Sequence, residues 1–228
     1  MKRTTGRLAN RPAQGSGANQ IRFFFVYNAS KSIAAIATAA HVIEQAHDWQ
    51  QPIKIIHHHS GEDAFLKEDE RVIFLDRKRD SASILMPANA LPFPPETLPL
   101  IDPTKIKKVG IQLGWVGFPS VAPSKLCFFS GFVSAFLDDR DCYLIDGIGI
   151  SGVSGGPVFA GQSGDTLKII GSVSAYVSNR VGDTAFPGLL RAQDISAFHE
   201  TIKQIKTLDE ARQKEKTEAK EAGSEPGS

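Results

Sequence analysis

The stretch Gly-Ile-Ser-Gly-Val-Ser-Gly-Gly-Pro-Val, from Gly149 to Val158, contains four glycines in ten residues. Because glycine lacks a Cβ, this density indicates a backbone shaped by tight turns rather than by side-chain packing. Ser154 lies inside it, with glycines two residues before and one residue after. Such a turn can present a hydroxyl group and leave neighbouring N–H groups free to bind an anion. The pattern is typical of a serine nucleophile; an ordinary glycine-rich loop between two strands is the alternative interpretation.

A serine hydroxyl is a weak nucleophile unless a base, and a group that orients the base, lie beside it. His41 ends an apolar run of small residues, and Asp80 begins another apolar segment. Asp76 stands four residues before Asp80 and is a second candidate acid. The candidate base, acid and nucleophile therefore follow one another along the chain as His41, Asp80 and Ser154.

The segments Thr38-Ala-Ala-His41 and Gly152-Val-Ser-Gly-Gly-Pro157 resemble the histidine and serine motifs of trypsin-like (chymotrypsin-fold) serine proteases. The order His, Asp, Ser is also that of this family, and it differs from the orders used by subtilisins and α/β-hydrolases. The resemblance extends from about residue 21 to residue 198 and is weakest between residues 50 and 72.

The resemblance implies a role for each member of the triad. Ser154 would attack the scissile carbonyl, His41 would move the proton, and Asp80 would hold the imidazole in one tautomer. The backbone N–H groups of Gly152 and Ser154 would form the oxyanion hole. The family's Asp-x-Ala spacing favours Asp80 over Asp76 as the acid.

The resemblance also places the pocket for the side chain that precedes the cut bond. Ile148 would form its base, and Ser172, Ser174 and Tyr176 would form its wall. None of these residues carries a charge. An unpaired Lys or Arg side chain would cost several kcal/mol in such a pocket. We therefore expect small or medium uncharged residues there, such as Ala, Val, Thr or Leu.

Short strand-like segments separated by turn residues extend over most of the chain. The proline-rich segment 88–103 cannot form a central strand or a helix, so it is expected to be an extended crossover. Together with the resemblance, this pattern predicts an all-β fold. Two antiparallel six-stranded β-barrels, at about 20–88 and 104–192, would flank the active-site cleft.

Apolar residues recur with a helical period after Asp194, which is a plausible N-cap, and predict a C-terminal helix over about 194–208. We expect this helix to pack on the second barrel and to end a protease domain at 20–208. Residues 1–19 are expected to be a disordered basic leader. Residues 209–228 are rich in Glu, Lys, Ala and Gln, and are expected to be a disordered charged tail, a candidate contact for a partner.

The composition restricts the class of protein. With 228 residues, 41% of them hydrophobic, and a formal charge of +1, the chain indicates a soluble globular protein with no preference for nucleic acid or membrane. A hairpin between the two cysteines, Cys127 and Cys142, would place Cys142 opposite a residue near Phe136, so no disulfide is expected. Scarce cysteine and the lack of an apolar signal segment predict a cytoplasmic location. An organellar transit peptide is the alternative, because no acidic residue precedes Glu44.

The sequence His57-His58-His59 invites a metal site, but adjacent residues of an extended segment point to alternating faces. A polar turn is the favoured interpretation, and no metal or organic cofactor is expected. The predicted activity is that of a serine endopeptidase that hydrolyses proteins or peptides through an acyl-enzyme. The alternatives are a catalytically inactive protease fold that serves as a binding module, and an esterase that uses the same triad.

Overall fold

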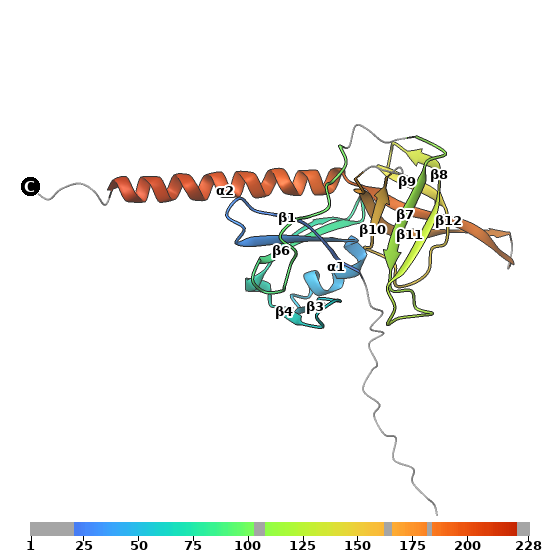
Figure 1. Cartoon of the computed structure of the whole chain (residues 1–228), viewed down its shortest axis with the longest axis horizontal. Coiled ribbons are helices and arrows are strands. Elements are labelled where there is room, and N and C mark those ends of the chain that lie inside the picture. The colour runs from blue at the N-terminus through green and yellow to red at the C-terminus, as the bar shows by residue number, and fades with distance from the viewer. Residues whose placement is uncertain (1–20, 103–107, 162–165, 182–183, 223–228) are drawn as a thin grey trace, which may run out of the picture.

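Two β-structures occupy the two halves of the chain, and a long helix follows them (Figure 1). The computed structural model describes residues 21–102, 108–161, 166–181 and 184–222. The expected leader and the end of the expected tail lie outside these residues. The first half contains β1 (Phe23–Tyr27), β2 (Ile33–Thr38), α1 (Ala40–Asp48), β3 (Ile53–Ile56), β4 (Asp63–Leu66), the 3-10 turn η1 (Glu68–Glu70), β5 (Val72–Asp76) and β6 (Ser81–Pro87).

The strands of the first half do not close into the expected six-stranded barrel. They form a four-stranded antiparallel sheet in the order β1-β2-β6-β5 and a separate β3-β4 hairpin. β2 and β6 are buried along nearly their whole length, so both faces of this sheet are covered. Residues of one face join a core that includes α2 and the second half, and residues of the other join a core with α1 and β3. Closure is not needed to bury the apolar side chains, because other elements cover both faces.

The second half forms the closed barrel that the sequence predicts. Its strands follow the order β10-β11-β12-β9-β8-β7, and neighbours are antiparallel. In the β8-β9 hairpin Cys142 pairs with Leu137, one residue from the expected position, and both cysteines are free thiols. The strands are β7 (Gln112–Gly117), β8 (Cys127–Leu137), β9 (Cys142–Asp146), β10 (Pro157–Ala160), β11 (Lys168–Val181) and β12 (Thr184–Asp194).

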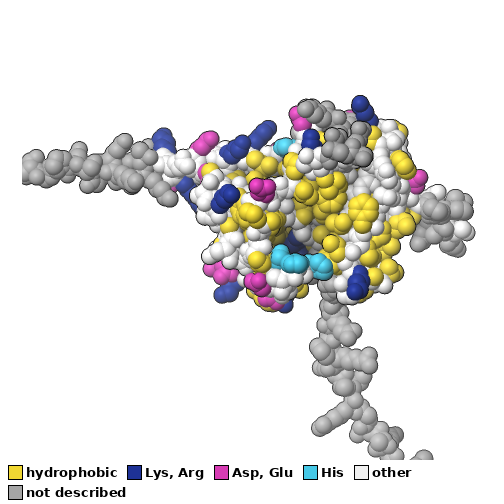
Figure 2. Space-filling view, viewed as in Figure 1, with side chains coloured by type: hydrophobic (Ala, Val, Ile, Leu, Met, Phe, Trp, Pro, Cys, Tyr) yellow, Lys and Arg dark blue, Asp and Glu magenta, His cyan; other side chains and the backbone are white. Residues whose placement is uncertain are grey.

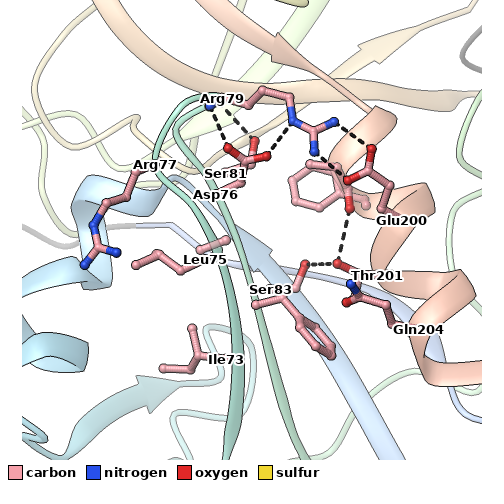
Figure 3. A pocket seen from close by; sticks show the side chains of 14 residues that line it. Ile73, Leu75, Asp76, Arg77, Arg79, Ser81, Ser83, Glu200, Thr201 and Gln204 are labelled. Carbon is pink, nitrogen blue, oxygen red and sulfur yellow. Dashed lines mark hydrogen bonds and ion pairs between the residues drawn. The ribbon is translucent and has the colours of Figure 1, made fainter. Parts of the chain in front are cut away.

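The C-terminal helix α2 (Ser196–Ala222) leaves the barrel and runs along the sheet of the first half, not along the second barrel as expected (Figure 1). The ring of Phe198 meets that of Phe23 edge-on, with centroids 5.8 Å apart. The hydroxyls of Ser83 and Thr201 are hydrogen-bonded at 3.0 Å. The aromatic face of β1 is the reason for this position, since it offers the first turns of α2 an apolar surface to bury. A pocket of about 380 Å³ remains between β5, β6 and α2 (Figure 3).

The helix also continues to Ala222, through much of the segment expected to be a disordered tail. This segment consists mainly of strong helix formers, namely Ala, Glu, Lys, Gln and Arg. Asp209 fixes the middle of the helix, because its carboxylate accepts hydrogen bonds from Asn28 Nδ2 at 3.0 Å and from the N–H of Ala29 at 2.8 Å. Neither helix in the described part of the chain has the length and hydrophobicity needed to cross a membrane.

Candidate active site

His41 and Asp80 meet where the ladder between β2 and β6 ends. The last pair of that ladder is Thr38 with Ala82, so the residues after Thr38 lie beside those before Ala82. His41 Nδ1 is 3.0 Å from each carboxylate oxygen of Asp80, and the backbone N–H of His41 donates to Oδ1, also at 3.0 Å. An ionised carboxylate can only accept, so in the neutral imidazole Nδ1–H is the donor and Nε2 is the unprotonated nitrogen that can act as a base.

The environment sets the charges of this pair. The hydrogen bond that His41 donates to Asp80 raises the pKa of the imidazole above its ordinary value, and it outweighs the opposite effect of partial burial. Burial by itself would raise the pKa of Asp80, but hydrogen bonds from His41 and Ser174 lower it below its ordinary value. Asp80 is therefore ionised at neutral pH. The imidazole side chain remains 45% exposed and the carboxylate side chain 17% exposed, so His41 is the member that a substrate can reach.

The second candidate acid, Asp76, belongs to a different network (Figure 3). Its Oδ2 lies 2.6 Å from Arg79 Nε, and its Oδ1 accepts the backbone N–H of Arg79 at 2.9 Å. Arg79 also holds Glu200 of α2 at 2.5 Å. Of the two acids, Asp80 is therefore the one in contact with His41, whereas Asp76 helps to attach the helix to the sheet.

Ser154 lies in a loop that packs closely against the end of β2. Gly155 has a φ of +78°, and a Cβ at this position would collide with the hydroxyl of Thr38 and the carbonyl of Ile21. The N–H of Ile21 donates to the carbonyl of Ser154 at 3.2 Å. This contact brings the loop to the end of β2, the strand after which His41 follows. Among the described residues, the hydrogen bonds of His41 all go to Asp80, and none joins His41 to Ser154.

Within residues 152–156, two backbone N–H groups have no acceptor among the described residues. The N–H groups of Val153, Gly155 and Gly156 donate to the carbonyls of Ile150, Val173 and Val153. In the described part of the chain, the N–H groups of Gly152 and Ser154 have no acceptor. Gly152 has a φ of +96°, a left-handed conformation that glycine adopts without steric cost. The two free groups are the pair expected to bind an anion.

We expect Gly155→Ala to destabilise the protein by about 1–3 kcal/mol, because it combines a left-handed backbone with a collision against other backbone atoms. Gly61→Ala is the matched control, since Gly61 has a φ of +76° and nothing within 4 Å of the added Cβ. Chemical denaturation of both variants measures the difference. Equal losses of stability in the two variants would show that the loop is not packed against β2.

The four residues assigned to the substrate pocket are in different settings. Ile148 is 60% exposed, which places it on the surface and not at the base of a pocket. Ser172 and Ser174 are buried, and the hydroxyl of Ser174 donates to Asp80 Oδ2 at 2.5 Å. We expected both side chains to form the wall of the pocket. Both are instead shielded from solvent, and the hydroxyl of Ser174 points to Asp80, while Val173 between them belongs to the barrel core.

Tyr176, the fourth residue of this set, contacts both the serine loop and β12. A Cβ on Gly149 would lie 2.9 Å from Cδ2 of Tyr176 and 3.1 Å from Cδ1 of Leu190. The phenol oxygen of Tyr176 accepts the N–H of Gly188 at 2.5 Å. The ring therefore lies between the loop at Gly149 and β12.

The three adjacent histidines form a turn at the end of β3, as predicted. His57 Nδ1 is 2.8 Å from the hydroxyl of Ser60, and the ring of His58 packs against Phe118 with centroids 4.7 Å apart. Figure 2 shows histidine side chains together beside a hollow in this face of the molecule. Within the described ranges, no three His, Cys, Asp or Glu residues are grouped so that they could hold a metal ion.

Sequence reasoning missed the role of Ser174 beside Asp80, and it missed Arg191 entirely. Arg191 Nη2 and Nε lie 3.0 and 3.3 Å from the hydroxyl of Ser174, and Nη2 lies 4.0 Å from Asp80 Oδ2. No motif marks Arg191, which lies between apolar residues of a strand. Only the pairing of β11 with β12 brings it to the site.

A closed barrel, a glycine-bordered serine loop and an Asp-bound histidine define the class of trypsin-like peptidase folds. Residues 24–167 match the family model of the trypsin-like peptidase domain. The chain belongs to this family.

Solved structures show the same fold. A serine endoprotease from Yersinia pestis matches with a TM-score of 0.53 and 18% identity, over 80% of this chain and 56% of that one. The HtrA-type protease AlgW with a decapeptide matches with a TM-score of 0.54 and 19% identity, over 75% of this chain and 48% of that one. This chain therefore spans about half the length of these structures. A search of curated proteins found no matching relative.

Proposed function

We propose that the protein is a serine endopeptidase with Ser154 as nucleophile, His41 as general base and Asp80 as the group that orients the base. The observation that carries this proposal is the contact of His41 Nδ1 with Asp80, at 3.0 Å. The N–H groups of Gly152 and Ser154, which have no acceptor among the described residues, support it. The family membership supports a peptidase in general.

In the proposed reaction, His41 Nε2 takes the proton of the Ser154 hydroxyl as Oγ attacks the carbonyl carbon of the substrate. The N–H groups of Gly152 and Ser154 stabilise the oxyanion that forms, and ionised Asp80 stabilises the imidazolium. His41 then gives the proton to the leaving amine, and the carbon–nitrogen bond breaks to leave an ester on Ser154. Water, activated in the same way, hydrolyses that ester and restores the enzyme.

A peptide substrate fits the proposal, because the similar AlgW structure was solved with a decapeptide. Cytoplasmic residence and a partner contact through the C-terminal segment stay predictions.

The test is labelling by a fluorophosphonate probe, which reacts only with an activated serine, followed by an assay on peptides and on small esters. We expect labelling of the wild type, no labelling of Ser154→Ala, and cleavage of peptides. A folded wild type that does not react would support the inactive binding module, and labelling with hydrolysis of esters alone would support the esterase.

Tyr176 sets the size of the accepted side chain in this proposal. We expect Tyr176→Ala to raise kcat/KM for Phe or Leu before the cut bond, relative to Ala, by roughly tenfold or more, since buried methylene groups are each worth this order of discrimination. Cleavage of a peptide library measures the change. Tyr176→Phe is the control, because it keeps the ring and should keep the preference. A dominant Lys, Arg, Asp or Glu in the wild-type profile would contradict the assignment of this pocket.

A further inference from the structure

Arg191 connects β12 to the residues around His41. Its guanidinium group reaches the hydroxyl of Ser174 on β11 through two N–H groups, with Nη2 at 3.0 Å and Nε at 3.3 Å. The same hydroxyl is 2.5 Å from Asp80 Oδ2. Asp80 in turn binds His41. A continuous line of contacts therefore runs from Arg191 to the imidazole, through two side chains that are largely buried.

The direction of the hydrogen bonds along this line is fixed by chemistry. A guanidinium group only donates, and a hydroxyl has one hydrogen and two lone pairs. Because Arg191 donates to the oxygen of Ser174, the hydroxyl hydrogen is free to point at Asp80. An ionised carboxylate only accepts, so Ser174 is held as a donor between its two neighbours. Without Arg191, the hydroxyl would lose the partner that orients its lone pairs.

We propose that Arg191 is a positioning residue of the candidate active site, which locks Ser174 as a donor to Asp80 and holds a positive charge beside the Asp80–His41 pair. Its effect on rate rests on the proposed peptidase function, whereas its effect on the ionisation of His41 does not. Arg191 touches neither the expected substrate nor the reacting atoms, and it acts through Ser174 and Asp80.

Three charged groups influence His41. Asp80 and Glu44 of α1 raise the pKa of the imidazole, and Arg191 lowers it. Since His41 must be neutral to take the proton of Ser154, a lower pKa leaves more of it in the active form near neutral pH. Removal of Arg191 should therefore raise the pKa of His41 and move the acid limb of kcat/KM to higher pH.

The direct test is an NMR titration of His41 in the full-length protein, with the resonance assigned by comparison with His41→Gln. We expect a higher pKa of His41 in Arg191→Met than in the wild type. Arg140→Met is the matched control, because Arg140 is an exposed arginine of the same barrel that contacts Asp139. An unchanged titration of His41 in folded Arg191→Met would overturn the proposal, and this result does not depend on any turnover.

Kinetic measurements test the claim that Arg191 positions Ser174 and Asp80. In Arg191→Met we expect kcat/KM to fall by roughly tenfold to a hundredfold, the order of loss seen when an orienting partner is removed, with the larger loss at acid pH. Arg191→Lys keeps the charge but not the paired N–H groups. It should leave the pH profile in place and lower kcat. If Arg191→Met does not fold, Arg191→Lys remains decisive, because wild-type kcat in that variant would contradict a positioning role.

Discussion

Ser154→Ala is expected to lower kcat by roughly 10⁶-fold, the loss found when the nucleophile of a serine triad is removed. The methyl group cannot form the acyl-enzyme, and the remaining N–H groups of Gly152 and Ser154 can stabilise only a slow attack by water. The fold should be unaffected, because Ser154 is only half-buried and the change removes a single oxygen atom. Peptide hydrolysis and thermal unfolding measure the two effects separately.

Two further variants test the assignment of Ser154 as the nucleophile. Ser151→Ala makes the same chemical change three residues earlier, at an exposed position of the same loop, and should retain activity. His41→Ala should lose about as much as Ser154→Ala, and the double variant should lose little more, since the residues of a triad act as a unit. Substantial peptide cleavage by a clean preparation of Ser154→Ala would refute the assignment of the nucleophile.

Asp80→Asn is expected to lower kcat by roughly 10⁴-fold with the fold intact. A carboxamide can donate its N–H to Nδ1 and so stabilise the tautomer in which Nε2 carries the proton and cannot act as a base. It also loses the negative charge that stabilises the imidazolium and that raises the pKa of His41. The measurements are kcat at several pH values and the NMR titration of His41, whose pKa should fall.

Asp76→Asn is the matched control, because it makes the same change four residues earlier. Asp76 binds Arg79, which also binds Glu200 on α2, so we expect a loss of stability of about 1 kcal/mol and near-normal kcat. The pKa of Asp76 is lowered in the folded protein, so its contribution to stability is present at neutral pH and is lost as the pH falls through that pKa. If Asp76→Asn were the inactive variant, the roles of the two acids would have to be exchanged.

The serine loop and the second barrel could be predicted from the amino-acid sequence because their constraints are local. Gly152 and Gly155 have positive φ angles, which glycine adopts at the lowest steric cost, so the sequence itself marks these turns. The strands of the second barrel are bounded by turn residues that interrupt each apolar run. The helical period after Asp194 likewise predicts a helix, whichever surface that helix covers.

The other features depend on contacts between segments that are far apart in the chain. Phe23 and Phe25 of β1 offer an apolar face, so α2 packs on the first half, and the four-stranded sheet needs no closure. The register of β2 with β6 puts Asp80 beside His41, whereas in the sequence only a loose motif favours Asp80 over Asp76. The pairing of β11 with β12 gathers Ser174 and Arg191 at Asp80. Strand register and helix docking result from burial summed over the whole fold, and no short stretch of sequence carries that information.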